Sequence, residues 1–289
     1  MVATSFVPFA LLGYVVAAGG LLVVRRGLAG RWRTAATLTV VLCLVGVLVH
    51  VVLLAPAYVG RHASGRPDVT VMTANLRLGQ ADPAAVVRIA RDARADVVVL
   101  EEVDSSEYAA LAGLKDALPY AAGAPEPGSI GTVIFSRYRL DGLTPVPVSK
   151  SAWAVHVDAT RPFWVLGLHT SQPMAWPDAW REDFAQVDHA VRGAPGPLVI
   201  AGDFNATLDH APMRRLLRLG FADAARQANS GWQPTWPGDS TAAGGLPFGL
   251  SVVALDHVLT TKEFSAISTS TYHVPGSDHR ALVARLALR

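Results

Sequence analysis

The chain has 289 residues, of which 51% are hydrophobic and 17% are charged. Charged residues make up roughly 25% of an average soluble protein, and the deficit lies at one end, because residues 1–60 contain four arginines and no acidic residue. The rest of the chain carries 21 basic and 23 acidic residues, a formal charge of −2, which lacks the basic footprint of a protein that grips a polyanion. The single cysteine, Cys43, excludes an intrachain disulfide and, after residue 60, a cysteine-based metal site or thiol nucleophile.

Two apolar segments occupy the N-terminal part, at residues 6–24 and 34–59. Each is long enough to cross a bilayer, which takes about 20 apolar residues. A signal peptide fits the first segment poorly, since no lysine or arginine precedes it and a second apolar segment follows. A buried hairpin of a soluble protein is the other alternative, and it would need a large core to cover both helices. We therefore predict a transmembrane hairpin over residues 1–60.

The connector between the two segments sets the predicted orientation. Residues 25–33 contain four arginines, and short loops rich in arginine stay on the cytoplasmic side of a membrane. Arg61, His62 and Arg66 follow the second segment and oppose this orientation only weakly. We expect a multi-pass protein of the cell membrane whose remaining residues lie outside the cytoplasm.

After a short polar linker at residues 61–68, predicted strands and helices alternate. Asp82 and Pro83 begin a helix as N-cap and first helical residue, and the apolar run at residues 97–103 is typical of a strand buried on both faces. The other patterns predict strands at 69–76, 132–136, 152–159, 163–169, 198–201, 254–260, 267–273 and 281–288, and helices at 82–94, 105–118, 177–192 and 211–219. Residues 233–249, rich in proline and glycine, are predicted to form a long surface loop. Mixed elements of this kind predict sheets covered by helices.

Acidic, amide and imidazole side chains recur at the C-terminal ends of the predicted strands. They are Asn75, Glu102, His169, Asp203, Asn205, Asp256, Asp278 and His279. Any one of them has an ordinary explanation, since an asparagine can stabilise a turn and a histidine can be satisfied within a loop. Strand ends lead into loops, however, so side chains there can converge on one cleft. The joint pattern therefore predicts a catalytic cleft.

Six segments that carry these residues resemble the signature blocks of the endonuclease/exonuclease/phosphatase superfamily, which includes nucleases of the deoxyribonuclease I type and neutral sphingomyelinases. The blocks occur in family order at residues 71–76, 96–103, 166–170, 200–205, 255–258 and 276–280. The second block departs from the usual Gln-Glu pattern, because Glu101 stands in place of the glutamine. Glu102 then corresponds to the glutamate that binds the metal in the family. The resemblance implies an α+β fold of four layers over residues 69–289, with two packed β-sheets flanked by helices.

The resemblance also implies a reaction, the hydrolysis of a phosphate ester by direct attack of water. Carboxylate and carbonyl oxygens suit a hard cation such as Mg²⁺, with Mn²⁺ as a possible substitute. The implied metal ligands are Glu102, Asn75 and Asp278. The implied catalytic residues are Asp203 and Asn205 around the attacking water, the pair of Asp256 and His279, and His169 as a donor to a phosphoryl oxygen or the leaving group. The general base stays open between Asp203 and the Asp256–His279 pair.

The sequence is compatible with three functions. A membrane tether raises the effective concentration of lipid-linked or cell-envelope phosphates, so we expect the bilayer as a partner and such a phosphate as substrate. An extracytoplasmic nuclease fits the site equally, but the charge of −2 does not favour nucleic acid. An inactive anchored binding protein is the third, although every block keeps its acid, amide or imidazole. Trp236, in a Pro-Thr-Trp-Pro segment, is expected either to contact substrate or to pack in the core.

Overall fold

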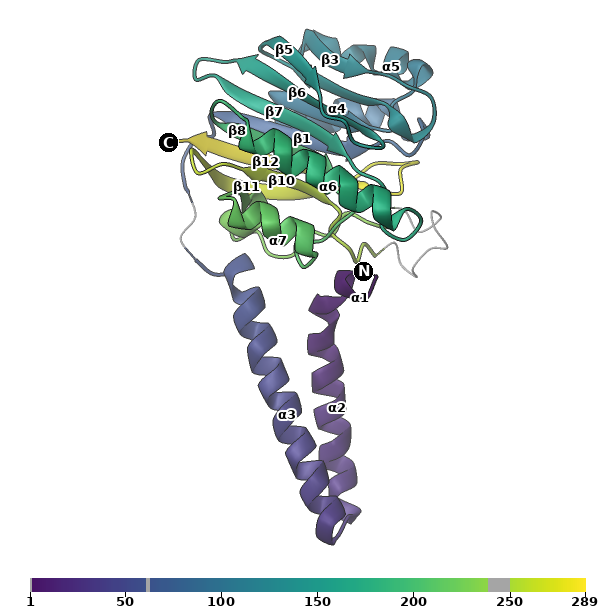
Figure 1. Cartoon of the computed structure of the whole chain (residues 1–289), viewed down its shortest axis with the longest axis vertical. Coiled ribbons are helices and arrows are strands. Elements are labelled where there is room, and N and C mark those ends of the chain that lie inside the picture. The colour runs from purple at the N-terminus through teal and green to yellow at the C-terminus, as the bar shows by residue number, and fades with distance from the viewer. Residues whose placement is uncertain (1, 61–62, 239–249) are drawn as a thin grey trace.

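Two apolar helices project from one side of an α+β unit in the computed structural model, which describes residues 2–60, 63–238 and 250–289 (Figure 1). In chain order the N-terminal helical segments are α1 (Val2–Ser5), η1 (Val7–Phe9), α2 (Ala10–Val24), η2 (Arg25–Gly27), α3 (Gly30–Leu54) and η3 (Ala55–Ala57). The two spans, Val7–Gly27 and Gly30–Ala57, are long and apolar enough to cross a membrane, and only 6% and 11% of their most apolar windows are buried. Packing against the rest of the chain therefore does not account for their apolar surface.

The second apolar helix begins at Gly30, four residues before the predicted start at residue 34. Arginine has nearly the helix propensity of leucine, so the arginines of the connector continue the helix instead of ending it. Arg31 and Arg33 accordingly lie in the first turn of α3, and the connector narrows to a turn around residues 25–29.

The α+β unit contains two six-stranded sheets. The first has the order β11-β12-β1-β2-β4-β3 and the second has the order β5-β6-β7-β8-β10-β9. The strands are β1 (Val69–Asn75), β2 (Val97–Glu101), β3 (Tyr120–Ala124), β4 (Thr132–Ser136), β5 (Arg139–Pro145), β6 (Ser151–Asp158), β7 (Phe163–His169), β8 (Leu198–Asp203), β9 (Ala222–Asp223), β10 (Asp256–Thr260), β11 (Phe264–His273) and β12 (Arg280–Leu288). The helices are α4 (Pro83–Ala93), α5 (Ser105–Ala110), α6 (Pro177–Arg192), α7 (Ala211–Arg218) and α8 (Ala224–Gln227), with short 3₁₀ segments η4 (Leu111–Asp116) and η5 (Gly128–Ile130).

Three apolar layers hold the sheets and helices together. The middle layer lies between the sheets, where Val99 of the first sheet and Val165 of the second belong to the same cluster of buried side chains. One outer layer contains Ile89 of α4, and the other contains Phe184 of α6 and Leu216 of α7. The result is a helix–sheet–sheet–helix sandwich, so the predicted four-layer α+β fold is confirmed.

Three strands, β3, β5 and β9, escaped prediction. β9 has only two residues, and the other two do not have the usual strand composition. β3 contains alanine and glycine with no β-branched residue, and β5 is an exposed edge strand that includes Gly142 and Pro145. The predicted helix at residues 105–118 divides into α5 and η4. Residues 61–62 of the predicted linker and residues 239–249 of the predicted loop lie outside the described part of the chain.

Strand pairing brings the polar strand ends to one edge of the sandwich. β1 and β2 run parallel with Asn75 opposite Glu101, and β7 and β8 run parallel with His169 opposite Asp203. β10 runs antiparallel to β8, which places Asp256 opposite Asp203. Gly202 allows this close packing, because it has a φ of +151° and a Cβ there would lie 1.9 Å from the carbonyl oxygen of Leu168.

Candidate active site

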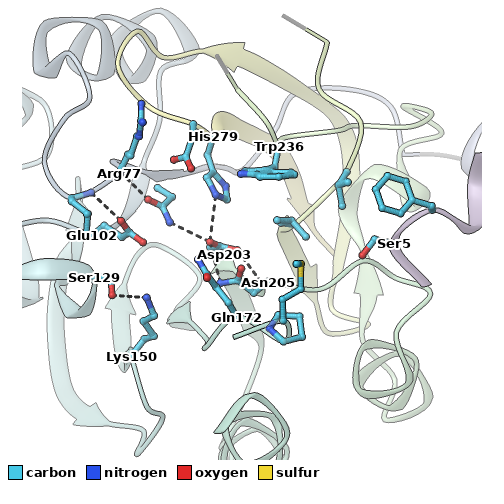
Figure 2. A pocket seen from close by; sticks show the side chains of 18 residues that line it. Ser5, Arg77, Glu102, Ser129, Lys150, Gln172, Asp203, Asn205, Trp236 and His279 are labelled. Atoms are coloured by element: carbon cyan, nitrogen blue, oxygen red, sulfur yellow. Dashed lines mark hydrogen bonds and ion pairs between the residues drawn. The ribbon is translucent and has the colours of Figure 1, made fainter. Parts of the chain in front are cut away.

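A cavity of about 670 Å³ opens at this edge of the sandwich (Figure 2). Seven of the nine predicted site residues line it, from both sheets: Asn75, Glu102, Asp203, Asn205, Trp236, Asp278 and His279. His169 and Asp256 do not line the cavity and are buried behind it, in contact with residues that do. The structure thus brings all nine predicted residues to one place, seven at the surface of the cavity and two beneath it.

A buried chain of three ionisable groups, Asp256, His279 and Asp203, leads to the wall of the cavity. His279 Nδ1 lies 2.8 Å from Asp256 Oδ2, and His279 Nε2 lies 3.7 Å from Asp203 Oδ2. Burial lowers the pKa of His279, but the carboxylates of Asp256 and Asp203 outweigh it and raise that pKa to about 10. Burial raises the pKa of Asp203 to about 7 although His279 opposes this. The two carboxylates therefore favour the protonated imidazole, while burial opposes the ionisation of Asp203.

Asp203 is oriented from both sheets. Its Oδ1 accepts a hydrogen bond of 2.8 Å from the backbone N–H of Asn205, which has a φ of +45°. Its Oδ2 accepts a hydrogen bond of 3.1 Å from the side-chain amide of Asn75 in the other sheet. The amide of Asn205 donates to the carbonyl oxygen of Thr170 at 2.9 Å. These contacts fix the carboxylate and the amide of Asn205 side by side on the cavity wall.

The oxygen atoms next to Asp203 have the chemistry that a hard divalent cation requires. Glu102 Oε2 accepts a hydrogen bond from the backbone N–H of Leu78 at 2.9 Å, and Asn75 Oδ1 accepts one from Arg77 at 2.9 Å. These bonds hold a carboxylate and an amide oxygen at the same turn, and Asp278 adds a second carboxylate to the cavity wall. A set of oxygen ligands without sulfur fits Mg²⁺ or a similar cation.

His169, predicted to donate to a phosphoryl oxygen or the leaving group, lies behind the carboxylates of Glu102 and Asp203. Its side chain is 1% exposed, and Nε2 lies 3.8 Å from Glu102 Oε1 and 3.6 Å from Asp203 Oδ2. Burial, together with the positive charges of Lys150 and His279, holds the pKa of His169 well below its usual range. The ring is therefore neutral, and its donation to a phosphoryl oxygen stays a prediction.

Trp236 is half-buried and lines the cavity, and its backbone pairs with Val253, whose N–H lies 2.9 Å from the tryptophan carbonyl oxygen. The side chain thus forms part of the wall on the side opposite Glu102 and Lys150 (Figure 2). Contact between this ring and a substrate stays a prediction.

Two basic residues of the cavity were not predicted from the sequence. Arg77 and Lys150 both line it, and Lys150 Nζ donates a hydrogen bond to Ser129 Oγ (Figure 2). Positive charge near the carboxylates suits an anionic substrate. Arg77 could have been found, because it follows Asn75 by two residues, whereas Lys150 belongs to no recognisable pattern.

Glu101, the residue that departs from the family pattern, is fully buried beneath the site. Thr73 Oγ1 donates to its Oε1 at 2.8 Å, while Oε2 has no hydrogen-bond partner among the described residues. Burial, and then the charge of Asp256, raise the pKa of Glu101 well above its usual range. The side chain is therefore held in its neutral form, which resembles the glutamine that it replaces.

Glu101→Gln is expected to raise the melting temperature, and the gain is expected to grow as the pH rises from about 5 to about 8. A carboxyl group whose pKa is raised by folding is stabilising at low pH and loses that contribution as the pH climbs from its unfolded toward its folded pKa, whereas glutamine does not titrate. A gain of about 1 kcal/mol corresponds to about 2–4 °C in a domain of this size. Thermal unfolding in detergent with a chelator measures it, and Glu182→Gln on the exposed face of α6 is the control. A difference in melting temperature that is independent of pH would contradict the buried neutral carboxyl.

Comparisons with known proteins agree with this geometry. The model of the Endonuclease/Exonuclease/phosphatase family matches residues 72–279. A solved endonuclease/exonuclease/phosphatase from Beutenbergia cavernae is 24% identical, with a TM-score of 0.60 over 77% of this chain and 72% of its own. A humanized TDP2 from D. rerio is 14% identical, with a TM-score of 0.62 over 75% of this chain and 98% of its own. An endonuclease/exonuclease/phosphatase from Bacteroides vulgatus is 17% identical, with a TM-score of 0.60 over 76% of this chain and 99% of its own.

At these identities the solved structures establish a shared fold. No curated protein matches the chain in sequence. The family model, by contrast, spans the strands, the turns and the polar residues that meet in the cavity. The chain belongs to the endonuclease/exonuclease/phosphatase family and is a phosphoester hydrolase that depends on a divalent metal.

Proposed function

We propose that this enzyme hydrolyses the phosphate ester of a membrane lipid or another lipid-linked phosphate of the cell envelope. The observation that carries the proposal is the wall of the cavity itself. Ser5 and Phe6, which lead into the first apolar helix, line the same cavity as Asp203 and His279. The reacting phosphate would therefore lie at the end of the α+β unit that faces the membrane.

The location of the enzyme follows from the same arrangement. The arginine-rich residues 25–33, which form the turn and the first residues of α3, lie at the far tip of the hairpin, away from the α+β unit (Figure 1). Arginines in a short loop favour the cytoplasmic side. We propose that the hairpin crosses the membrane, that the bilayer is a partner and that the α+β unit lies outside the cytoplasm.

The metal in this proposal is Mg²⁺, with Mn²⁺ as a substitute, held by Glu102, Asn75 and Asp278. When bound, such a cation polarises a phosphoryl oxygen and stabilises the charge that develops during attack. Asp203, Asp256 and His279 also offer ligand atoms within 4.8 Å of one another. We favour the site at Glu102, Asn75 and Asp278 over this second cluster, because His279 is hydrogen-bonded to Asp256 and carries a positive charge that repels a cation.

The same pKa values support one assignment of the proton transfers. His279 is protonated at neutral pH, so Asp203 is the group that accepts a proton from the attacking water, while Asn205 holds the water or a phosphoryl oxygen. As the bond between phosphorus and the leaving oxygen breaks, His279 donates a proton to that oxygen, with Asp256 fixing its ring. Arg77 and Lys150 neutralise the remaining charge of the phosphate.

A nuclease is the second candidate. A solved TDP2 from D. rerio that is described as complexed with a single-strand DNA product is 13% identical to this chain, with a TM-score of 0.61. The chemistry of the site suits a DNA phosphodiester as well as a lipid one. The charge of −2 after residue 60 favours the lipid, because nucleic-acid binding draws most of its affinity from neutralised phosphates. The intact set of acids, amides and imidazoles in the cavity argues against an inactive binding protein.

A substrate panel tests the proposal. The full-length enzyme in lipid nanodiscs is assayed with Mg²⁺ on phosphatidic acid, phosphatidylglycerol, sphingomyelin, undecaprenyl pyrophosphate and plasmid DNA, with Glu102→Ala as the background. We expect kcat/KM for at least one lipid phosphate to exceed that for DNA by about tenfold or more, about 1.4 kcal/mol of discrimination. Preferential cleavage of DNA would overturn the proposal in favour of the nuclease. Removal of the α+β unit by protease added outside intact spheroplasts tests its location.

A further inference from the structure

A second cavity, of about 320 Å³, lies between the hairpin and the α+β unit. Its hairpin side is apolar and includes Phe9 and Leu12, which precede and begin α2, and Leu54 at the end of α3. Trp232 closes it from the α+β unit, with its ring edge-on to Phe9 at 5.4 Å between centroids. Its volume falls within the range of about 300–1,000 Å³ of small-molecule sites.

This second cavity adjoins the catalytic one. Ser5 lines both of them. Phe6 lines the catalytic cavity and Phe9, three residues further, lines the second. A molecule whose phosphate lay beside Asp203 could therefore extend past Ser5 toward the two apolar helices.

The helices open toward this cavity. Figure 1 shows α2 and α3 converging at the arginine-rich turn and separating toward the α+β unit. They are held together by Tyr14, which packs against His50 with 5.3 Å between ring centroids and leaves room only for a glycine at position 46, where a Cβ would lie 2.9 Å from the tyrosine ring. Leu12 precedes Tyr14 on α2 and Leu54 follows His50 on α3, so both lie on the side of this contact that leads toward the α+β unit.

The two walls of the cavity differ in polarity. Opposite the apolar hairpin side lie Asp209, Asp223 and Arg226 of the α+β unit. A molecule that fills the space can therefore present a hydrocarbon part to one wall and a polar part to the other. A membrane lipid does so in the region where its polar linkage joins its tail.

We propose that this cavity is a tail site, which holds the hydrocarbon chain of the lipid whose phosphate is hydrolysed beside Asp203. This proposal rests on the proposed function. It adds where the hydrocarbon chain of the substrate binds while its phosphate is in the catalytic cavity. The tail lies between α2 and α3 at the level of Leu12 and Leu54, so the lipid stays largely within its leaflet while its phosphate reaches the catalytic cavity. Chain length then becomes a determinant of specificity, in addition to the head group.

Leu54→Trp tests the tail site by filling it with a larger apolar side chain that remains compatible with the bilayer. The readout is the ratio of kcat/KM for a long-chain lipid to kcat/KM for the same phosphate on a short chain. Two pairs are compared. One is dipalmitoyl and dihexanoyl phosphatidic acid, and the other is undecaprenyl and geranyl pyrophosphate. We expect Leu54→Trp to lower this ratio by about tenfold or more, and the pair in which it falls identifies the class of lipid. The matched control is Val52→Trp on the same helix, since Val52 is 61% exposed and lines neither cavity.

The outcomes separate the two proposals. A ratio that is equal in wild type, Leu54→Trp and Val52→Trp overturns the tail site and leaves the proposed function intact. A wild-type enzyme that cleaves DNA and neither long-chain lipid overturns both. A lipid phosphate with a photoreactive group in its tail gives a second measurement that does not depend on the folding of a variant. We expect it to label residues 8–12, residues 54–58 and Trp232, and labelling spread evenly over the outward faces of the helices would overturn the tail site.

Discussion

Glu102→Ala is expected to lower kcat/KM in the presence of Mg²⁺ by about 10³-fold or more, and a chelator is expected to abolish the activity of the wild type. Glu102 is the carboxylate at the turn that also positions the oxygen of Asn75, so its loss removes the central negative ligand of the proposed metal site. Steady-state kinetics on the preferred substrate and calorimetric titration with Mg²⁺ measure the two effects separately.

Glu102→Gln separates the charge of this residue from its structural role. Glutamine can still accept the hydrogen bond from the backbone N–H of Leu78, so the turn is kept while the negative charge is removed. We expect weak Mg²⁺ binding with a melting temperature near that of the wild type in the absence of metal. Glu182→Ala, on the exposed face of α6, serves as the control. Wild-type activity and metal affinity in Glu102→Gln would remove Glu102 from the metal site.

His279→Ala and Asp256→Asn are expected to lower kcat by about 10²–10⁴-fold, the usual range for a general acid. The wild type is expected to have a bell-shaped pH profile, with activity rising as Asp203 loses its proton and falling as His279 loses its own near pH 10. A divalent cation in the cavity favours the ionised carboxylate of Asp203 and disfavours the protonated ring of His279. In the metal-bound enzyme the acid limb therefore lies below about 7 and the alkaline limb below about 10.

The position of the alkaline limb distinguishes a charge effect from damage to the fold. Asp256 is the main group that raises the pKa of His279, so Asp256→Asn is expected to move this limb to lower pH as well as to reduce the maximal rate. His189→Ala, exposed on α6, is expected to change neither property. An alkaline limb at the same pH in Asp256→Asn would show that His279 does not act as the protonated group.

Much of the fold follows from local patterns in the sequence. The apolar run at residues 97–103 predicted the buried strand β2, and Asp82 caps α4 as expected, accepting a hydrogen bond from Ala84 N–H at 2.9 Å. β3 and β5 could not be predicted in this way. They form because β4 and β6 offer them edges to pair with, which is a property of the assembled sheet and not of their own residues.

The site was predictable to the extent that its residues follow strands. Asp203 and His279 belong to short blocks at strand ends, and the pairing of the strands brings them together. Lys150 reaches the cavity from a segment without a pattern, and Ser5 and Phe6 reach it from the far end of the chain. No local pattern in the sequence predicts which surface an apolar hairpin will contact, so this contact is seen only in the three-dimensional structure.

The contribution of Ser5 and Phe6 to the cavity has a practical consequence for work on this enzyme. A fragment that begins after the second helix would retain every proposed metal ligand and proton-transfer group, yet one side of the catalytic cavity would be missing. Assays on that fragment would report intrinsic reactivity toward small phosphate esters and would understate selectivity among natural substrates. Inhibitor screens therefore need the full-length chain.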